Sequence, residues 1–275
     1  MSFRVIAIAN QKGGVGKTTT AINLGTALAA ANRRVLVIDC DAQGNASTGF
    51  GIEPRLREKT SYDVLVGEAS IAEAIIPTEV PQLGIVPGDE NLAGVETLLH
   101  TDARKNYRLK DALDLFRRAS LEGVAAAAED QKLEYDIVLI DCPPSLSTVT
   151  INAMTAADSV LVPLQCEFLA LEGLSQLLRT VDLVRGALNP SLEIQGVVLT
   201  MFDKRNNLSD QVASEVRSFF GAKVYQTVIP RNVRLSEAPS FGKPALLYDY
   251  KCSGSEAYIK LASELLQRER ERNAA

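Results

Sequence analysis

A glycine-rich loop near the amino terminus constrains the fold of this chain more than any other feature. The apolar run VIAIAN precedes it, the loop reads KGGVGKTT over residues 12–19, and a helix-forming stretch continues to residue 31. A loop placed between a strand and the start of a helix directs backbone N–H groups at one point and favours bound phosphate. The alternative is a glycine turn that holds no ligand.

Further apolar runs rich in β-branched residues follow, with helical patterns between them. Each run is apolar on both faces, as expected for strands of a parallel sheet that helices cover on both sides. We therefore predict an α/β fold with a doubly wound, mostly parallel twisted sheet flanked by helices. The further expected strands are RVLVID, LGIVPG, YDIVLID, SVLVPL and IQGVVLT, ending at residues 39, 88, 141, 164 and 200. The expected helices are 17–31, 109–118, 147–157, 169–188, 208–220 and 255–272.

The 275 residues show no internal repeat, no Pro/Ser-rich linker and no sharp change in composition. We therefore predict one compact domain over residues 1–275. An alanine-rich acidic stretch, 120–131, is expected to be a surface extension or a continued helix. The end of the chain, 268–275, reads RERERNAA and is expected to be a flexible tail.

Composition excludes several kinds of site. No apolar run is long enough to span a membrane, and the first residues do not read as a signal peptide, so we expect a cytoplasmic protein. Four cysteines, Cys40, Cys142, Cys166 and Cys252, form no CxxC pair, and we expect buried reduced thiols. Because His100 is the only histidine, catalysis has to use carboxylates, lysines, hydroxyls and backbone groups.

The residue types of the glycine-rich loop indicate how it would hold ATP or ADP. Glycines allow backbone N–H groups to surround the β-phosphate, while Lys17 reaches the β- and γ-oxygens. The Thr18 hydroxyl is placed to coordinate Mg²⁺. We predict nucleotide contacts from Gly13, Gly14, Val15, Gly16, Lys17, Thr18 and Thr19.

The loop departs from the common motif at one end. The motif G-x-x-x-x-G-K-[ST] would place glycine at position 11, where this chain has Gln11 followed by a second lysine, Lys12. With KGGVGKT, the loop resembles that of the ParA/MinD family of P-loop ATPases, which have a deviant Walker A motif. The resemblance implies that Lys12 crosses a dimer interface to the phosphates of the partner's nucleotide, and that Gly13 keeps two facing loops unobstructed. A surface lysine beside the loop is the alternative.

Carboxylates end two of the expected strands. The segment DCDAQGN at 39–45 resembles the family's DxDPQGN, with Ala42 in place of proline. The resemblance implies that Asp41 orients the attacking water and that Asp39 supports the magnesium shell. Asp141 ends the run IVLID with the pattern of a Walker B carboxylate that acts on Mg²⁺ through water. Helix capping is the alternative, above all for Asp39. The expected catalytic residues are Lys12, Lys17 and Asp41, with Thr18, Asp39 and Asp141 at the metal.

Three further segments resemble the chromosome-partitioning ParA/Soj ATPases. They are CEFLALEGLSQLL at 166–178, LTMFDKRNNLS at 199–209 and VIPRNVRLSEAPSFGKP at 228–244, and the likeness covers nearly all of residues 3–266. It implies an ATP-dependent homodimer that binds double-stranded DNA without sequence preference in the nucleoid. It also implies slow ATP hydrolysis that a ParB-type adaptor stimulates. Near the nucleotide base, it indicates Met201, Asp203, Pro230 and Asn232.

Basic residues in the carboxyl-terminal third are expected to contact the DNA backbone. The net charge of −5 does not favour a uniformly basic surface, but residues 200–251 carry eight basic and five acidic side chains. Because phosphate contacts add up, a dimer that presents two copies binds much more tightly than a monomer. A solvated face of mixed charge is the alternative. By the resemblance, the expected DNA-binding residues are Arg205 and Arg234, followed by Lys223, Lys243 and Lys251.

Related functions stay as alternatives. A ParA-like ATPase would position a protein cargo by the same DNA cycle. A MinD-like regulator of division-site placement would need a membrane-binding tail, whereas here the stripe from Tyr258 to Leu266 is expected to pack on the domain, so we expect no membrane partner. The cysteines do not match an iron–sulfur relative. A small-molecule ligase resembling dethiobiotin synthetase would need its own substrate pocket, for which no residues are evident.

Overall fold

The computed structural model describes residues 3–122, 134–168 and 170–274. In these ranges the chain forms a seven-stranded sheet with the order β3-β4-β2-β5-β1-β6-β7. All neighbouring strands run parallel except β3 and β4, which confirms the predicted doubly wound, mostly parallel sheet. The strands are β1 (Arg4–Ile8), β2 (Val35–Asp39), β3 (Ile76–Pro77), β4 (Leu83–Val86), β5 (Ile137–Asp141), β6 (Ser159–Gln165) and β7 (Glu193–Thr200).

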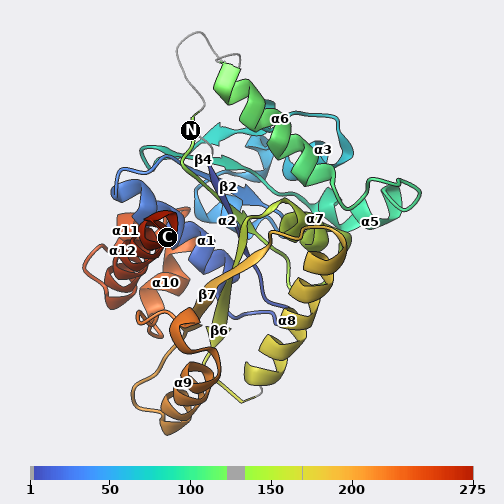
Figure 1. Cartoon of the computed structure of the whole chain (residues 1–275). Helices are drawn as coiled ribbons and strands as arrows, with labels where there is room; N and C mark the ends of the chain where they lie inside the picture. Colours follow the sequence, from blue (N-terminus) through green and yellow to red (C-terminus); the bar gives the residue numbers. More distant parts are fainter. Residues whose placement is uncertain (1–2, 123–133, 169, 275) are drawn as a thin grey trace.

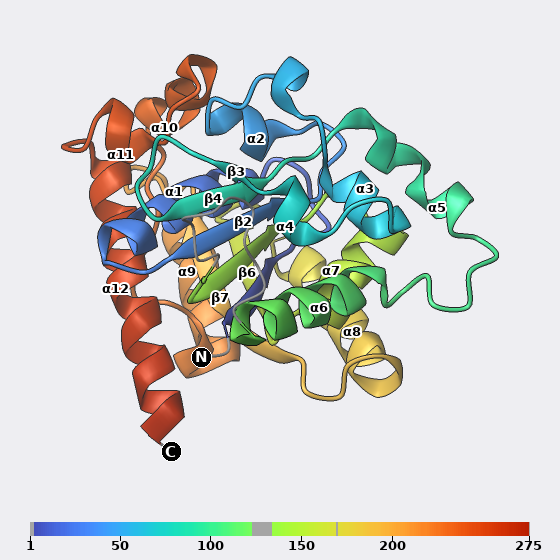
Figure 2. The same cartoon turned by 90° about the horizontal axis from the view of Figure 1, so that it is seen from above.

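Helices cover both faces of the sheet (Figure 1, Figure 2). One layer contains α1, α10, α11 and α12, and the other contains α3, α5, α6, α7, α8 and α9. Ile6 and Ile8 of β1 pack into the first layer, and Val5 and Ala7 pack into the second, because successive strand residues point to opposite faces. The helices are α1 (Lys17–Ala30), α2 (Asn45–Gly49), α3 (Ser61–Val66), α4 (Ile71–Ala74), α5 (Val95–Leu98), α6 (Arg108–Glu122), α7 (Thr148–Ala156), α8 (Ala170–Ala187), α9 (Asn207–Phe220), α10 (Val233–Glu237), α11 (Ala245–Tyr248) and α12 (Ser253–Ala274).

The register of three central strands brings their carboxyl ends together. Ile8 of β1 lies opposite Asp141 of β5, and Asp39 of β2 lies opposite Asp141 from the other side. The loop that follows β1 and the acids that end β2 and β5 are therefore neighbours. In open α/β sheets this edge, at the carboxyl ends of the strands, is where ligands bind.

The observed elements differ from the prediction mainly where they are short. The edge strand β3 has two residues, runs antiparallel to β4 and contains Pro77, so it has no period that a sequence pattern reveals. Helices α2, α3, α4, α5, α10 and α11 each have only four to six residues and were missed for the same reason. Of the predicted extension at 120–131, residues 120–122 continue α6 and the others lie outside the described residues.

Most of the tail expected at 268–275 belongs to α12, which continues to Ala274, two residues beyond the expected end of this helix. Arg268 donates to the carbonyl oxygen of Val224 at 3.0 Å and to Glu264 at 2.9 Å. Arg272 donates to Glu269 at 2.8 Å. The alternating charges therefore form ion pairs one helical turn apart, which stabilise a helix rather than a disordered tail.

Two further expectations concern cysteines and membrane spans. Cys40, Cys142 and Cys166 are buried free thiols as predicted, whereas Cys252 is half-buried. Among the described helices, none has both the length and the apolar character that crossing a bilayer requires.

Candidate functional site

The glycine-rich loop connects β1 to α1 at the carboxyl edge of the sheet. Gly14 and Gly16 have φ values of +73° and +90°, which residues with side chains rarely adopt. Gly16 caps α1 without a side-chain hydrogen bond, so the first N–H groups of the helix have no side-chain acceptor at the cap. Thr200 Oγ1 donates to the carbonyl oxygen of the buried Val15 at 2.8 Å and fixes the loop to the end of β7. This geometry suits an anion.

Lys17, the first residue of α1, lies inside the loop. Its side chain is buried, and Nζ donates to the carbonyl oxygen of Lys12 at 3.0 Å. Burial lowers the pKa of Lys17, while the nearby acids Asp141 and Asp41 and the thiol of Cys142 raise it. The next two residues, Thr18 and Thr19, are half-buried. An enclosed cation at the start of a helix is a suitable partner for a phosphate.

Lys12 has a different environment from Lys17. Its side chain is 43% exposed and forms an ion pair with Glu167, in the loop that follows β6. Its backbone N–H donates to Asn10 Oδ1 at 3.0 Å, and Gly13 beside it is exposed. The loop therefore carries one enclosed lysine and one lysine at the surface.

The three predicted acids meet at this edge, but their bonding differs. Asp39 Oδ2 accepts hydrogen bonds from Ser47 N at 2.8 Å and Ser47 Oγ at 2.6 Å, and its Oδ1 accepts one from Asp41 N at 3.2 Å. Asp41 Oδ1 accepts from Gln43 N at 3.0 Å, and its side chain is only half-buried. Asp39 therefore fixes the loop after β2 and the start of α2, which agrees with the capping alternative.

Asp141 is fully buried, and its carboxylate oxygens accept no hydrogen bond of good geometry among the described residues. Burial raises the pKa of Asp141 well above its usual value and the charge of Asp39 raises it further, whereas the nearby Thr18 hydroxyl and the Lys17 ammonium lower it. A buried carboxylate with such weak compensation is costly unless a cation or a proton neutralises its charge. Its oxygens and the Thr18 hydroxyl therefore fit a divalent cation that keeps part of its water shell.

The described residues contain no cluster of three or more His, Cys, Asp or Glu side chains able to hold a metal by themselves.

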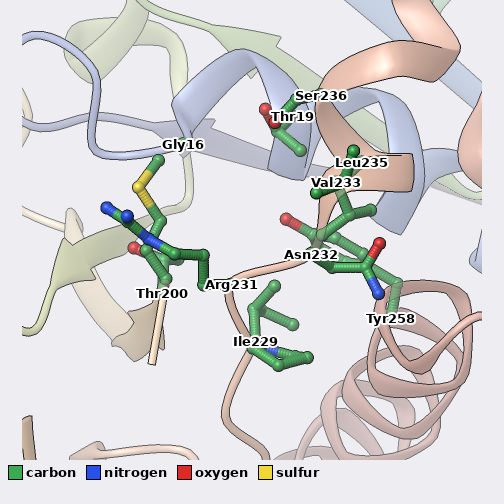
Figure 3. Close-up of a pocket in the computed structure, with 12 residues that line it drawn as sticks. Gly16, Thr19, Thr200, Ile229, Arg231, Asn232, Val233, Leu235, Ser236 and Tyr258 are labelled. Atoms are coloured by element: carbon green, nitrogen blue, oxygen red, sulfur yellow. The ribbon is translucent and has the colours of Figure 1, made fainter. Parts of the chain in front are cut away.

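A cavity of about 260 Å³ lies beside the glycine-rich loop. Figure 3 shows it between Gly16 and Thr200 on one side and the α10 residues Val233, Leu235 and Ser236 on the other. Met201, Pro230 and Asn232 line it, so the structure brings these three predicted residues together. Gly16 and Thr19, both predicted to contact the nucleotide, line it as well. Residues that the sequence did not indicate also line it, namely Thr200, Ile229, Arg231, Val233, Leu235, Ser236 and Tyr258.

Asp203, the fourth residue expected near the base, does not line this cavity. Its carboxylate accepts from Arg205 Nε at 2.9 Å and from a second guanidinium nitrogen at 2.8 Å. These hydrogen bonds lower the pKa of Asp203 to about 2. The side chain therefore orders the turn before α9.

The five predicted DNA-binding residues are all exposed and fall into two groups. Arg234, Lys243 and Lys251 belong to the segment that contains α10 and α11, where Arg234 pairs with Glu237 at 2.8 Å and Asp249 at 3.5 Å. Arg205 and Lys223 flank α9. Arg205 also borders a depression of about 570 Å³ that Lys204, Arg231 and Lys260 line, together with the acids Asp203 and Glu256.

Sequence reasoning missed two residues that shape the acidic loop. A Cβ at Gly88 would lie 2.8 Å from the carbonyl oxygens of Asp39 and Asp41, so only glycine fits after β4. Arg57 donates to the carbonyl oxygen of Gly88 at 2.9 Å and to Thr48 Oγ1 at 2.9 Å. Gly88 ends the run LGIVPG, but nothing in that run indicates which backbone approaches it.

The fold and the site together define an α/β protein of the P-loop nucleotide-binding class, with a second lysine in the phosphate loop. The family model described as "AAA domain" matches residues 3–194. Over 99% of its length the chain is 63% identical to the chromosome partitioning protein ParA of Caulobacter vibrioides, covering 97% of that protein. Over 95% of its length it is 52% identical to the sporulation initiation inhibitor protein Soj of Bacillus subtilis, covering 98% of that protein. The chain belongs to the ParA/Soj family of chromosome-partitioning ATPases.

Solved structures agree with this assignment. A Mycobacterium smegmatis protein named cobyrinic acid a,c-diamide synthase, crystallised with ADP and magnesium, has a TM-score of 0.80 and 35% identity. The match covers 98% of this chain and 96% of that protein. The cell division ATPase MinD of Pyrococcus furiosus has a TM-score of 0.74 and 28% identity, over 96% of this chain and 98% of that protein.

Proposed function

We propose that this protein is a DNA-partition ATPase that works as a nucleotide-dependent dimer. ATP with Mg²⁺ drives two subunits together, the dimer binds double-stranded DNA without sequence preference, and a ParB-type adaptor stimulates hydrolysis and release. The observation that carries this proposal is the unequal environment of the two loop lysines. Lys17 is enclosed within its own loop, whereas Lys12 stands at the surface and is available to a second subunit.

The residues of one subunit have distinct roles in this proposal. The N–H groups at the start of α1 and the Lys17 ammonium bind the phosphates. Thr18 and Asp141 hold the magnesium ion, which neutralises phosphate charge when it is bound. Asp41, half-buried at the end of β2, orients the attacking water, and Asp39 holds the loop that carries Asp41. Adenine fits the cavity that Met201, Pro230 and Asn232 line.

Exposed apolar side chains in the loops that follow β5 and β6 support a second copy of the chain as the cover of the phosphate loop. Phe168, next to Glu167, is 75% exposed, and Leu146, in the loop after β5, is 44% exposed. Large exposed apolar side chains at the carboxyl edge of the sheet favour a protein interface there. The partner's Lys12 would then reach the phosphates held by the first subunit.

Helix α10 links the nucleotide to the proposed DNA surface. Val233, Leu235 and Ser236 line the nucleotide cavity, whereas Arg234 is exposed. A dimer presents two copies of Arg234, Lys243 and Lys251, and of Arg205 with Lys223. Doubling the phosphate contacts raises affinity steeply at low salt. We therefore place the ATP-bound protein in the cytoplasm on the nucleoid.

Binding to a random-sequence DNA duplex, measured with ATP, ADP and no nucleotide, tests this function. We expect tight, salt-sensitive DNA binding in the ATP condition only, together with a doubling of the protein's mass in sedimentation. Equal DNA binding in all three conditions would exclude the nucleotide switch. An ATPase that positions a protein cargo would pass this test too. It would differ in failing to respond to a ParB-type protein in a phosphate-release assay.

A further inference from the structure

In the proposed function, Lys12 binds the nucleotide of the partner subunit. Hydrogen bonds hold both its backbone N–H and its backbone carbonyl oxygen. Its N–H donates to Asn10 Oδ1 at 3.0 Å, and its carbonyl oxygen accepts from Lys17 Nζ at 3.0 Å. Asn10 is itself held through a hydrogen bond from Nδ2 to the carbonyl oxygen of Pro163 at 2.8 Å. The Lys12 side chain can therefore exchange its binding partner while the backbone stays in place.

In the single subunit that partner is Glu167. Glu167 follows β6, whose neighbour β1 leads into the glycine-rich loop. Its backbone N–H donates to the carbonyl oxygen of Gln165 at 2.9 Å, which places the carboxylate at the carboxyl edge of the sheet. The carboxylate is thus carried by a different element from the loop, at the mouth of the phosphate site.

The ion pair between Lys12 and Glu167 is accessible to solvent, so Lys12 can exchange Glu167 for another anion at little cost. The Lys12 side chain is 43% exposed and that of Glu167 is 34% exposed. Ion pairs of this exposure shift an equilibrium by only about two- to fivefold. The triphosphate of ATP carries several negative charges, so it outcompetes the single carboxylate of Glu167 for the Lys12 ammonium group.

We propose that Glu167 is a positioning residue that holds Lys12 in the free subunit and competes with the partner's nucleotide for it. The inference rests on the proposed function, because it requires Lys12 to bind phosphate across a dimer. In the free subunit Glu167 keeps the ammonium ordered beside the loop. In the ATP dimer Lys12 leaves Glu167, and breaking the two pairs, one per subunit, sets part of the threshold for dimerisation.

Glu167→Gln removes the charge and keeps the shape of the side chain. We expect the ATP-bound variant to dimerise at a concentration about four- to 25-fold lower than the unmodified protein, because two pairs no longer have to break. Glu172→Gln is the matched control: it removes an exposed carboxylate of α8 that has no ion pair among the described residues, and it should not shift the equilibrium. Glu167→Asp keeps the charge and should lie closer to the unmodified protein than Glu167→Gln.

Sedimentation equilibrium with ATP measures this shift. Lysine acetylation, followed by mass spectrometry on the nucleotide-free protein, measures the pair without any dimer. Lys12 should be acetylated faster in Glu167→Gln than in the control. Unchanged dimerisation of Glu167→Gln, or weaker dimerisation than the control, would overturn the inference while leaving the proposed function standing. A protein that stays monomeric with ATP before any substitution would overturn the proposed function, and the inference with it.

Discussion

The two lysines of the phosphate loop are chemically identical, but their surroundings assign them different tasks. Lys17 is buried, its pKa is lowered by that burial, and its ammonium bonds to the backbone of the loop. Lys12 is near solvent and paired with a carboxylate of another element. At the residue scale we therefore expect substitution of Lys17 and substitution of Lys12 to impair different properties of the protein. The same holds for Asp41 and Asp39, whose hydrogen bonds differ.

Lys17→Ala should lower ATP affinity about 10- to 100-fold, because it removes a charge-assisted hydrogen bond to the phosphates. Titration with a fluorescent ATP analogue measures the affinity, and phosphate release measures the turnover. Lys110→Ala, on α6 in the opposite helix layer, is the control. Unchanged affinity together with unchanged turnover would refute the phosphate-binding role of Lys17.

Asp41→Ala should keep the ATP-dependent dimer and reduce hydrolysis by about 100-fold or more, as expected for loss of a group that positions the attacking water. The contacts of Asp39 with Ser47 do not involve the side chain of Asp41, so the loop should keep its shape. Sedimentation with ATP and a phosphate-release assay on the same sample read the two effects. Turnover at the level of the unmodified protein would assign the water to another residue.

At the scale of elements, the loops at the carboxyl edge depend on close backbone packing. Gly88 follows β4, and its N–H donates to Ser47 Oγ at 3.0 Å, while Ser47 Oγ donates to Asp39. The end of β4, the end of β2 and the start of α2 are thus joined in one hydrogen-bonded unit. Because that unit carries Asp41, its packing determines where the carboxylate that we propose to orient the attacking water lies.

Gly88→Ala should lower the free energy of unfolding by about 1–3 kcal/mol, because the added methyl group would meet two backbone carbonyl oxygens and overpack the site. Gly94→Ala is the control, since a Cβ at Gly94 has no heavy atom within 4 Å. The control should stay within about 0.5 kcal/mol of the unmodified protein. Urea unfolding measures the free energy of unfolding of Gly88→Ala and Gly94→Ala. Equal values would show that the loop after β2 moves to accept the added methyl group and would contradict the prediction.

At the scale of the whole molecule, the proposed DNA-binding residues are expected to act as a set. Arg234 in the single subunit is neutralised by Glu237 and Asp249, and Arg205 is neutralised by Asp203. Neither pairing would prevent the proposed DNA binding, because exposed ion pairs are weak and the binding of phosphate releases counterions. We expect the surface to bind DNA when two subunits present it together.

Arg234→Glu should weaken DNA binding by the ATP-bound protein and reduce the slope of log affinity against log salt by about two per dimer, one for each subunit. Dimerisation itself should not change. Lys110→Glu makes the same charge change on α6 and should leave the slope as it is. DNA binding that survives Arg234→Glu unchanged would place the DNA surface elsewhere, and the basic depression around Arg231 and Lys260 would be the next to test.

Much of the fold could be read from the sequence because its signals are local. The expected parallel strands and long helices are present, since apolar periodicity over five or more residues reflects burial on one or two faces. The phosphate loop and the strand-end acids were found because their residue types follow in sequence. The short elements and the absence of Asp203 from the cavity were missed, because each depends on partners remote in the chain or on ion pairs that composition does not specify.

The sequence by itself determined the class of fold, the position of the glycine-rich loop and the strand ends that carry the acids, because turn geometry and burial pattern depend on consecutive residues. Only the tertiary structure decided what each charged group faces. Among the described residues it leaves both oxygens of Asp141 without a hydrogen bond of good geometry, it bonds Asp39 to Ser47, and it pairs Lys12 with Glu167. The physical reason is that desolvation and pairing depend on atoms brought together from separate strands, and these set the protonation and the freedom of each side chain.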